Sequence, residues 1–174
     1  MTGHVDDTTA RGVFLARRQP DRYAQTRVLI AERSRLYAEA LMFALDANLE
    51  FEAVGYALDG WEALELTAEL QPDVLLVGPE LGGLDQLTLT RVTHFFWPRL
   101  RLILLGNAGP REINEAYALG AAEYLTPDRS AEELLTAIGA ACFRQRRQER
   151  GQTVALDSLL STLPKAGEIG RAHV

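Results

Sequence analysis

The chain has 174 residues, of which 47% are hydrophobic, so it is long enough for one domain with a substantial core and for extensions on both sides. No apolar run approaches the length of a membrane span, the N-terminus lacks the order of features of a signal peptide, and the single cysteine, Cys142, excludes an intramolecular disulfide. We therefore expect a soluble, cytoplasmic protein that has no membrane partner.

The net charge of −6 is unevenly distributed along the chain. Residues 27–143 carry 18 acidic and 8 basic residues (−10), residues 1–26 carry 3 and 4 (+1), and residues 144–174 carry 3 and 6 (+3). Such an acidic body repels nucleic acid. The basic run FRQRRQER, residues 143–150, ends a predicted helix, where basic side chains complement the helix dipole. We therefore do not expect this chain to bind nucleic acid directly.

Five short apolar runs predict β-strands at residues 27–31, 51–56, 73–78, 100–105 and 122–126. Helical periodicity lies between them and after the last one, where Ser130 and Glu133 have the spacing of a capping box. Strict alternation of strand and helix requires right-handed crossovers between parallel strands. The pattern predicts an α/β fold, a flavodoxin-like five-stranded parallel sheet of order 2-1-3-4-5 with helices on both faces.

The flanks of this domain differ from it in composition. Residues 1–25 are polar and have no periodic pattern, which predicts a flexible N-terminal arm, and the domain itself is expected at 26–149. Residues 150–174, with Gly151 near their start, are expected to form a C-terminal tail with a short amphipathic helix. Its apolar stripe consists of Leu156, Leu159, Leu160 and Leu163.

Several stretches, in their order and spacing, resemble the receiver domain of response regulators, and most of all the subfamily attached to LuxR-type DNA-binding domains. They span roughly residues 26–143 and read RVLIAERSRLYAEAL, VGYALDGWEALEL, QPDVLLVGPELGGLDQLTLTR, RLILLG, ALGAAEYL and AEELLTAI. The resemblance implies a signalling module whose functional groups gather where the strands end.

Receivers of this kind use an aspartate after the third strand as phosphoryl acceptor, an acidic pair after the first strand for Mg²⁺, a Ser or Thr after the fourth and a Lys after the fifth. By this resemblance the aspartate's position holds Gly78, and the acidic pair is Glu32 with Arg33. The hydroxyl's position holds Gly106 and the lysine's position holds Pro127. The resemblance thus implies a degenerate phosphorylation pocket.

Two further residues belong to this pocket by the same comparison. Tyr124 matches the aromatic residue that changes rotamer in switching receivers, and Glu80, two residues beyond Gly78, is the carboxylate placed to approach the pocket. A cation at Arg33 opposes a metal ion by like charge. We expect no metal, no cofactor and no catalytic residue. Whether Arg33 pairs with Glu32 or Glu80 or points to water is left open.

The sequence favours a phosphorylation-independent receiver that acts as a protein-interaction and dimerisation module in bacterial signalling or transcription regulation. We expect a homodimer and an unidentified protein partner. An alternative is a ligand-gated transcription regulator, or the receiver fragment of a longer DNA-binding regulator; an enzyme ranks last, because no phosphate loop or Ser/His/Asp set is present. Candidate interface residues are Leu135, Ile138, Cys142, Leu156, Leu159, Leu160, Leu163, Phe96 and Trp97.

Overall fold

The structure is a computed structural model that describes residues 25–162, apart from the side chains at positions 145, 146 and 149. Strands and helices alternate along this part of the chain: β1 (Thr26–Ala31), α1 (Arg35–Asp46), β2 (Phe51–Ala57), α2 (Gly60–Leu70), β3 (Val74–Val77), α3 (Gln86–Phe96), β4 (Arg101–Leu105), α4 (Pro110–Ala118), β5 (Glu123–Leu125) and α5 (Ala131–Thr162). The predicted N-terminal arm, apart from residue 25, and the end of the predicted tail, including Leu163, lie outside the described residues.

The five strands form one parallel sheet in the order β2-β1-β3-β4-β5, which confirms the predicted fold class and topology. β3 lies at its centre, and all of its residues are buried. The order reverses between β1 and β3, so the chain leaves these two neighbouring strands toward opposite faces of the sheet. Functional groups collect beside such a switch point, at the carboxyl edge of the strands.

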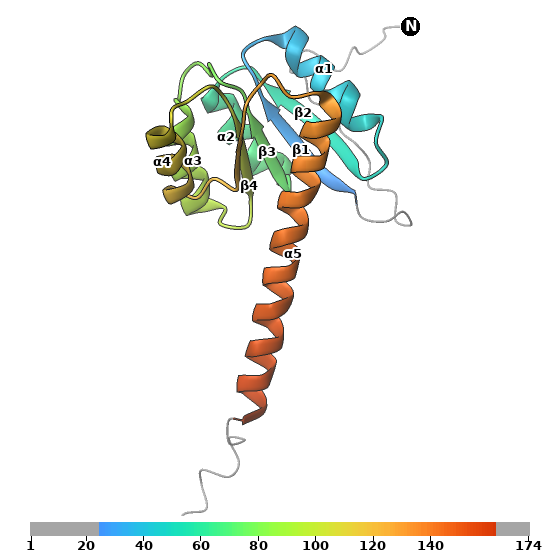
Figure 1. Cartoon of the computed structure of the whole chain (residues 1–174), viewed down its shortest axis with the longest axis vertical. Helices are drawn as coiled ribbons and strands as arrows, with labels where there is room; N and C mark the ends of the chain where they lie inside the picture. The colour runs from blue at the N-terminus through green and yellow to red at the C-terminus, as the bar shows by residue number, and fades with distance from the viewer. Residues whose placement is uncertain (1–24, 163–174) are drawn as a thin grey trace, which may run out of the picture.

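Two apolar cores cover the two faces of the sheet. One face packs against α1 and α5, and the other packs against α2, α3 and α4, as the two groups of helices show in Figure 1. Continuous burial of the strands on both faces explains why they read as apolar runs rather than as alternating patterns.

Side-chain caps fix the beginnings of four helices. Ser34, Asp59 and Asp85 each accept a hydrogen bond from a backbone N–H in the first turn of the helix that follows. The capping box predicted for α5 is confirmed: Ser130 N donates to Glu133 Oε2 at 2.8 Å, and Glu133 N donates to Ser130 Oγ at 3.2 Å.

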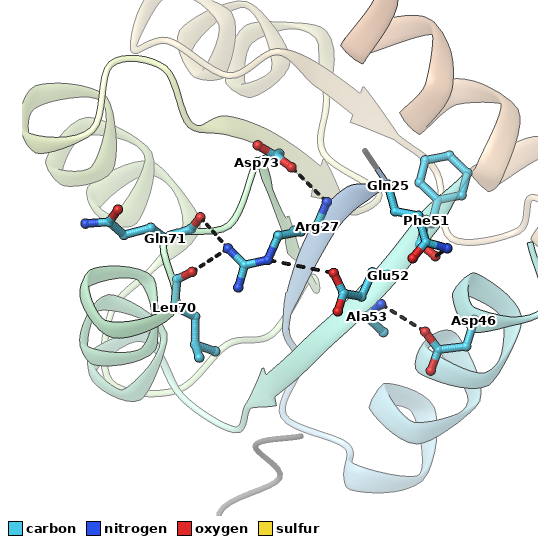
Figure 2. A network of polar contacts seen from close by, with 9 residues as sticks. All are labelled: Gln25, Arg27, Asp46, Phe51, Glu52, Ala53, Leu70, Gln71 and Asp73. Carbon is cyan, nitrogen blue, oxygen red and sulfur yellow. Dashed lines mark hydrogen bonds and ion pairs between the residues drawn. The ribbon is translucent and has the colours of Figure 1, made fainter. Parts of the chain in front are cut away.

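The amino edge of the sheet is joined by Arg27, whose role the sequence did not indicate (Figure 2). Its backbone N donates to Asp73 Oδ2 at 2.8 Å, and its Nη1 donates to the carbonyls of Leu70 and Gln71 at 2.7 and 3.0 Å. Its Nε lies 3.8 Å from Glu52 Oε2. The guanidinium and the backbone N–H of this one residue together tie the last carbonyls of α2 to the starts of β1, β2 and β3.

Helix α5 differs from the prediction. It is one continuous helix of 32 residues that runs through Gly151, where the sequence indicated the start of a separate tail, and it projects far beyond the sheet (Figure 1). One glycine within a helix costs only about 1 kcal/mol relative to alanine, and the surrounding residues are good helix formers. Among the described helices, none is long and apolar enough to cross a bilayer.

We predict that Leu45→Ala lowers the free energy of unfolding by about 2–5 kcal/mol, because Leu45 is buried between α1 and the sheet. The matched control is Leu36→Ala, the same chemical change on the exposed side of α1, which should alter stability by less than about 0.5 kcal/mol. Urea unfolding followed by circular dichroism measures both. Equal effects would contradict the packing described for α1.

Candidate functional site

The residues predicted to form the pocket follow the carboxyl ends of four strands. Glu32 and Arg33 follow β1, Gly78 follows β3, Gly106 follows β4 and Pro127 comes after β5. Because the strands are parallel, their carboxyl ends meet at one edge of the sheet. The structure brings two pairs of predicted pocket residues into direct contact, Glu32 with Gly78 and Tyr124 with Gly106.

The first pair is Glu32 and Gly78. The Glu32 side chain is only 7% exposed, and its Oε1 accepts a hydrogen bond of 2.8 Å from the backbone N of Ser34. Its other oxygen, Oε2, occupies the space in which a Cβ on residue 78 would stand. The backbone on both sides is fixed as well, since Gly78 N donates to Ala31 O at 2.8 Å and Glu32 N to Ala57 O at 2.9 Å. The Glu32 carboxylate thus fills the space that Gly78 leaves.

The second pair repeats this arrangement between β4 and β5. The hydroxyl of Tyr124 occupies the space in which a Cβ on Gly106 would stand. It also accepts a hydrogen bond of 3.2 Å from the backbone N of Ala108, which holds the ring over Gly106. At both positions, therefore, the side chain missing from a glycine is replaced by the end of a longer side chain from the neighbouring strand.

Gln86 is a member of the site that the sequence analysis missed. Its Nε2 donates to the carbonyl oxygens of Gly78 at 2.6 Å and Leu105 at 2.8 Å, and lies 3.3 Å from that of Val77. The amide therefore bridges the ends of β3 and β4. The sequence signal for this position was Asp85, a typical N-cap residue. Its carboxylate accepts a hydrogen bond from Thr88 N, so Gln86 is the first residue of α3 and lies at the sheet edge.

The sequence left open whether Arg33 forms an ion pair or points to water. Arg33 is exposed, and within the described part of the chain no salt bridge joins it to Glu32 or Glu80, so the alternative in which it points to water is favoured. Arg33 and Glu80, with Glu32, Ser34 and Pro79, line an open hollow of about 400 Å³. Pro127 is half-buried.

The residues present do not fit a divalent cation. One oxygen of Glu32 is engaged by Ser34 N, the other faces Gly78, and the neighbouring side chain is the cation Arg33. A hard cation such as Mg²⁺ requires free oxygen ligands. Among the described residues, no three His, Cys, Asp or Glu side chains gather as a metal site would require.

The candidate interface residues divide into two groups. Ile138 and Cys142 are buried in the domain's own core and Leu135 packs against it, so they are not available as a contact surface. Their helical spacing is that of the face with which α5 covers the sheet. The other described candidates lie at the surface. Phe96 is exposed and Trp97 half-buried, and the side chains of the stripe on α5 are exposed by 57% at Leu156, 64% at Leu159 and 60% at Leu160.

Comparison with known proteins identifies the domain. No family model matches the chain. The transcriptional regulatory protein NarL of Mycobacterium tuberculosis is 30% identical over 152 residues, which cover 87% of this chain and 65% of that protein. A protein-glutamate methylesterase/protein-glutamine glutaminase of Geobacter sulfurreducens is 25% identical over 146 residues, 74% of this chain and 39% of that protein.

The solved structure of the signal receiver domain of NarL from Mycobacterium tuberculosis superposes with a TM-score of 0.64 at 28% identity, over 67% of this chain and 96% of that domain. This chain carries a receiver domain of response regulators. Receiver domains of this kind belong to two-component signalling. The chain spans less than two thirds of the length of either curated relative.

We predict that Gly78→Ala lowers the free energy of unfolding of the receiver domain by about 1–3 kcal/mol, because the new Cβ displaces Glu32 and breaks its hydrogen bond to Ser34. In a Glu32→Ala background the same substitution should cost about 0.5 kcal/mol or less. Denaturant unfolding of the four proteins of this double-mutant cycle gives the coupling.

Gly82→Ala is the control for this cycle, because a Cβ at position 82 meets nothing within 4 Å. Additive effects of the Gly78 and Glu32 substitutions would contradict the contact between the two residues.

Proposed function

We propose that this receiver domain works without phosphorylation, as a dimerising protein-interaction module in cytoplasmic bacterial signalling or transcription regulation. The observation that carries the proposal is the Glu32 carboxylate, which fills the space beside Gly78. By resemblance, this is the place from which a receiver presents its phosphoacceptor aspartate.

The chemistry of the other positions supports the same proposal. Acceptance of a phosphoryl group requires a nucleophile, a metal ion that neutralises charge and donors for the transferred oxygens. Gly78 has no nucleophilic side chain, Arg33 opposes a cation, and Gly106 and Pro127 have no side-chain donor. Glu80 is exposed beside the hollow and is the carboxylate that remains to be tested as an acceptor.

The same geometry favours one conformation of the domain. The Tyr124 hydroxyl already occupies the space above Gly106 and accepts the hydrogen bond from Ala108. No phosphoryl-driven movement is then needed to bring the ring to this position. We therefore expect the domain to stay in one signalling state, in which its partners recognise a fixed surface.

The projecting half of α5 favours dimerisation. Leu156, Leu159 and Leu160 have a helical spacing of three and four residues and are exposed together with Val154, on the part of α5 that projects beyond the sheet. A long solvent-exposed helix gains little stability alone, and most helical stability in proteins comes from packing of an apolar face. If α5 pairs with α5 of a second copy about a two-fold axis, the apolar faces of both helices are buried against each other.

We predict that incubation with acetyl phosphate and Mg²⁺ leaves the intact mass of the chain unchanged, because the receiver offers no aspartate at residue 78. Intact-protein mass spectrometry measures the result, and a receiver that carries the aspartate serves as positive control for the reagent. An acid-labile gain of one phosphoryl group would overturn the proposal, and Glu80→Gln and Glu32→Gln would then locate the acceptor.

We predict that the full chain sediments as a dimer at tens of micromolar and that Leu159→Ser with Leu160→Ser shifts it to monomer. Each of the two side chains contributes about 1.5–3 kcal/mol when it is buried. The control is Arg150→Ser with Asp157→Ser, which alters two exposed polar residues of α5 and leaves the net charge unchanged.

Analytical ultracentrifugation compares the three proteins. A monomeric full chain would refute dimerisation. An equally dimeric double-serine variant would exclude the α5 stripe as the interface and leave Phe96 and Trp97 as the candidates.

A further inference from the structure

A second cavity lies at the edge of the sheet opposite to Glu32 and Gly78, where α5 leaves the body of the domain. Its volume is about 470 Å³. Its walls come from the C-terminal end of α3 with the loop after it, the start of β4, the turn before β5 and the middle of α5. The polar side chains that matter for its chemistry are those of Arg101, Arg99, His94, Gln148 and Gln152.

Arg101 is the unusual member of this lining. It is only 9% exposed, and its Nε, an atom closed off from solvent, has no hydrogen-bond partner within the described part of the chain. Arg27, at the same edge of the sheet, shows the contrast, because its guanidinium is satisfied by two carbonyls and faces the Glu52 carboxylate. A guanidinium stays protonated in proteins, so a buried one requires an acceptor.

Other polar side chains of the lining carry hydrogen-bond donors. His94, in the last turn of α3, adds a ring nitrogen, and Gln148 and Gln152 add amides from α5. No Asp or Glu is among the described residues that line the cavity. Gly120, with a φ of +110°, brings the turn before β5 close against the His94 ring and thereby fixes one wall.

We propose that this cavity is a binding site for a small phosphate-bearing molecule, with the guanidinium of Arg101 as its principal anchor. A planar guanidinium group binds phosphate oxygens through paired hydrogen bonds, and the surrounding amide and imidazole groups complement the remaining oxygens. The volume exceeds that of a bare phosphate ion and lies within the range of small-molecule sites.

Such a ligand links two parts of the receiver. It contacts Arg101 in the sheet and Gln148 and Gln152 on the part of α5 that continues toward the exposed stripe. The bound molecule therefore fixes the direction in which the projecting half of α5 leaves the domain. The site stands whether or not the domain accepts phosphate, because Gly78 does not belong to it, and it shares one residue, Leu156, with the apolar stripe of α5.

The test uses the full chain and three probes at equal ionic strength: inorganic phosphate, adenosine 5′-monophosphate and adenosine, with chloride as the reference salt. We expect saturable binding of the monophosphate in isothermal titration calorimetry, a rise in melting temperature with it, and no binding of adenosine. Arg101→Gln should weaken binding about tenfold or more, because it removes charge-assisted hydrogen bonds. Arg91→Gln, the same change at an exposed position of α3, should bind as the parent chain does.

A second variant, Gln152→Ala, covers the case in which Arg101→Gln does not fold. It changes an exposed residue of α5, should leave the circular dichroism spectrum unchanged and should weaken binding several-fold. Tighter binding of the monophosphate than of inorganic phosphate supports a phosphorylated metabolite, and equal binding supports free phosphate. The proposal is overturned if neither phosphate probe binds saturably, if adenosine binds as well as the monophosphate, or if the folded variants bind like the parent chain.

Discussion

The contact between the Glu32 carboxylate and the bare backbone of Gly78 governs the character of this receiver domain. A carboxylate removed from water is stabilised by hydrogen bonds to its charged form, and Ser34 N supplies one. Its place beside Gly78 exists only because that residue has no Cβ. Glycine at the end of β3 thus lets the Glu32 side chain become part of the packing.

Tyr124 fills the space beside Gly106 in the same way as Glu32 fills the space beside Gly78. Gln86 joins the two places, because its amide donates to the carbonyls at the ends of β3 and β4. These groups are packed or hydrogen-bonded at the ends of β3 and β4, beside the open hollow lined by Glu32, Arg33 and Glu80. Restoring a single acidic side chain therefore meets occupied space. We propose that the carboxyl edge of the sheet serves as a rigid support for the interaction surfaces of the domain rather than as a reaction site.

Much of this fold is predictable from the sequence, because continuous apolar runs such as Val74–Val77 and regularly spaced breakers determine a covered parallel sheet. The residue types at positions 33, 78 and 106, compared with the receiver pattern, gave the prediction of a degenerate pocket, which stays a prediction. The replacement contacts were not predictable: whether Glu32 turns inward or Arg33 forms an ion pair depends on rotamers and packing. The burial of Arg101 depends in the same way on tertiary context, whereas α5 continues through Gly151 because one glycine costs little among good helix formers.

The central claim is that the space around Gly78 and Gly106 is filled and does not receive a phosphoryl group. The most direct measurement is a two-dimensional amide NMR titration of the full chain with beryllofluoride, the phosphoryl mimic, and Mg²⁺. The account predicts that the amide signals of Gly78 and Gly106 keep their positions throughout the titration. Saturable shifts of these two signals, accompanied by movement of the Tyr124 ring signals, would contradict it.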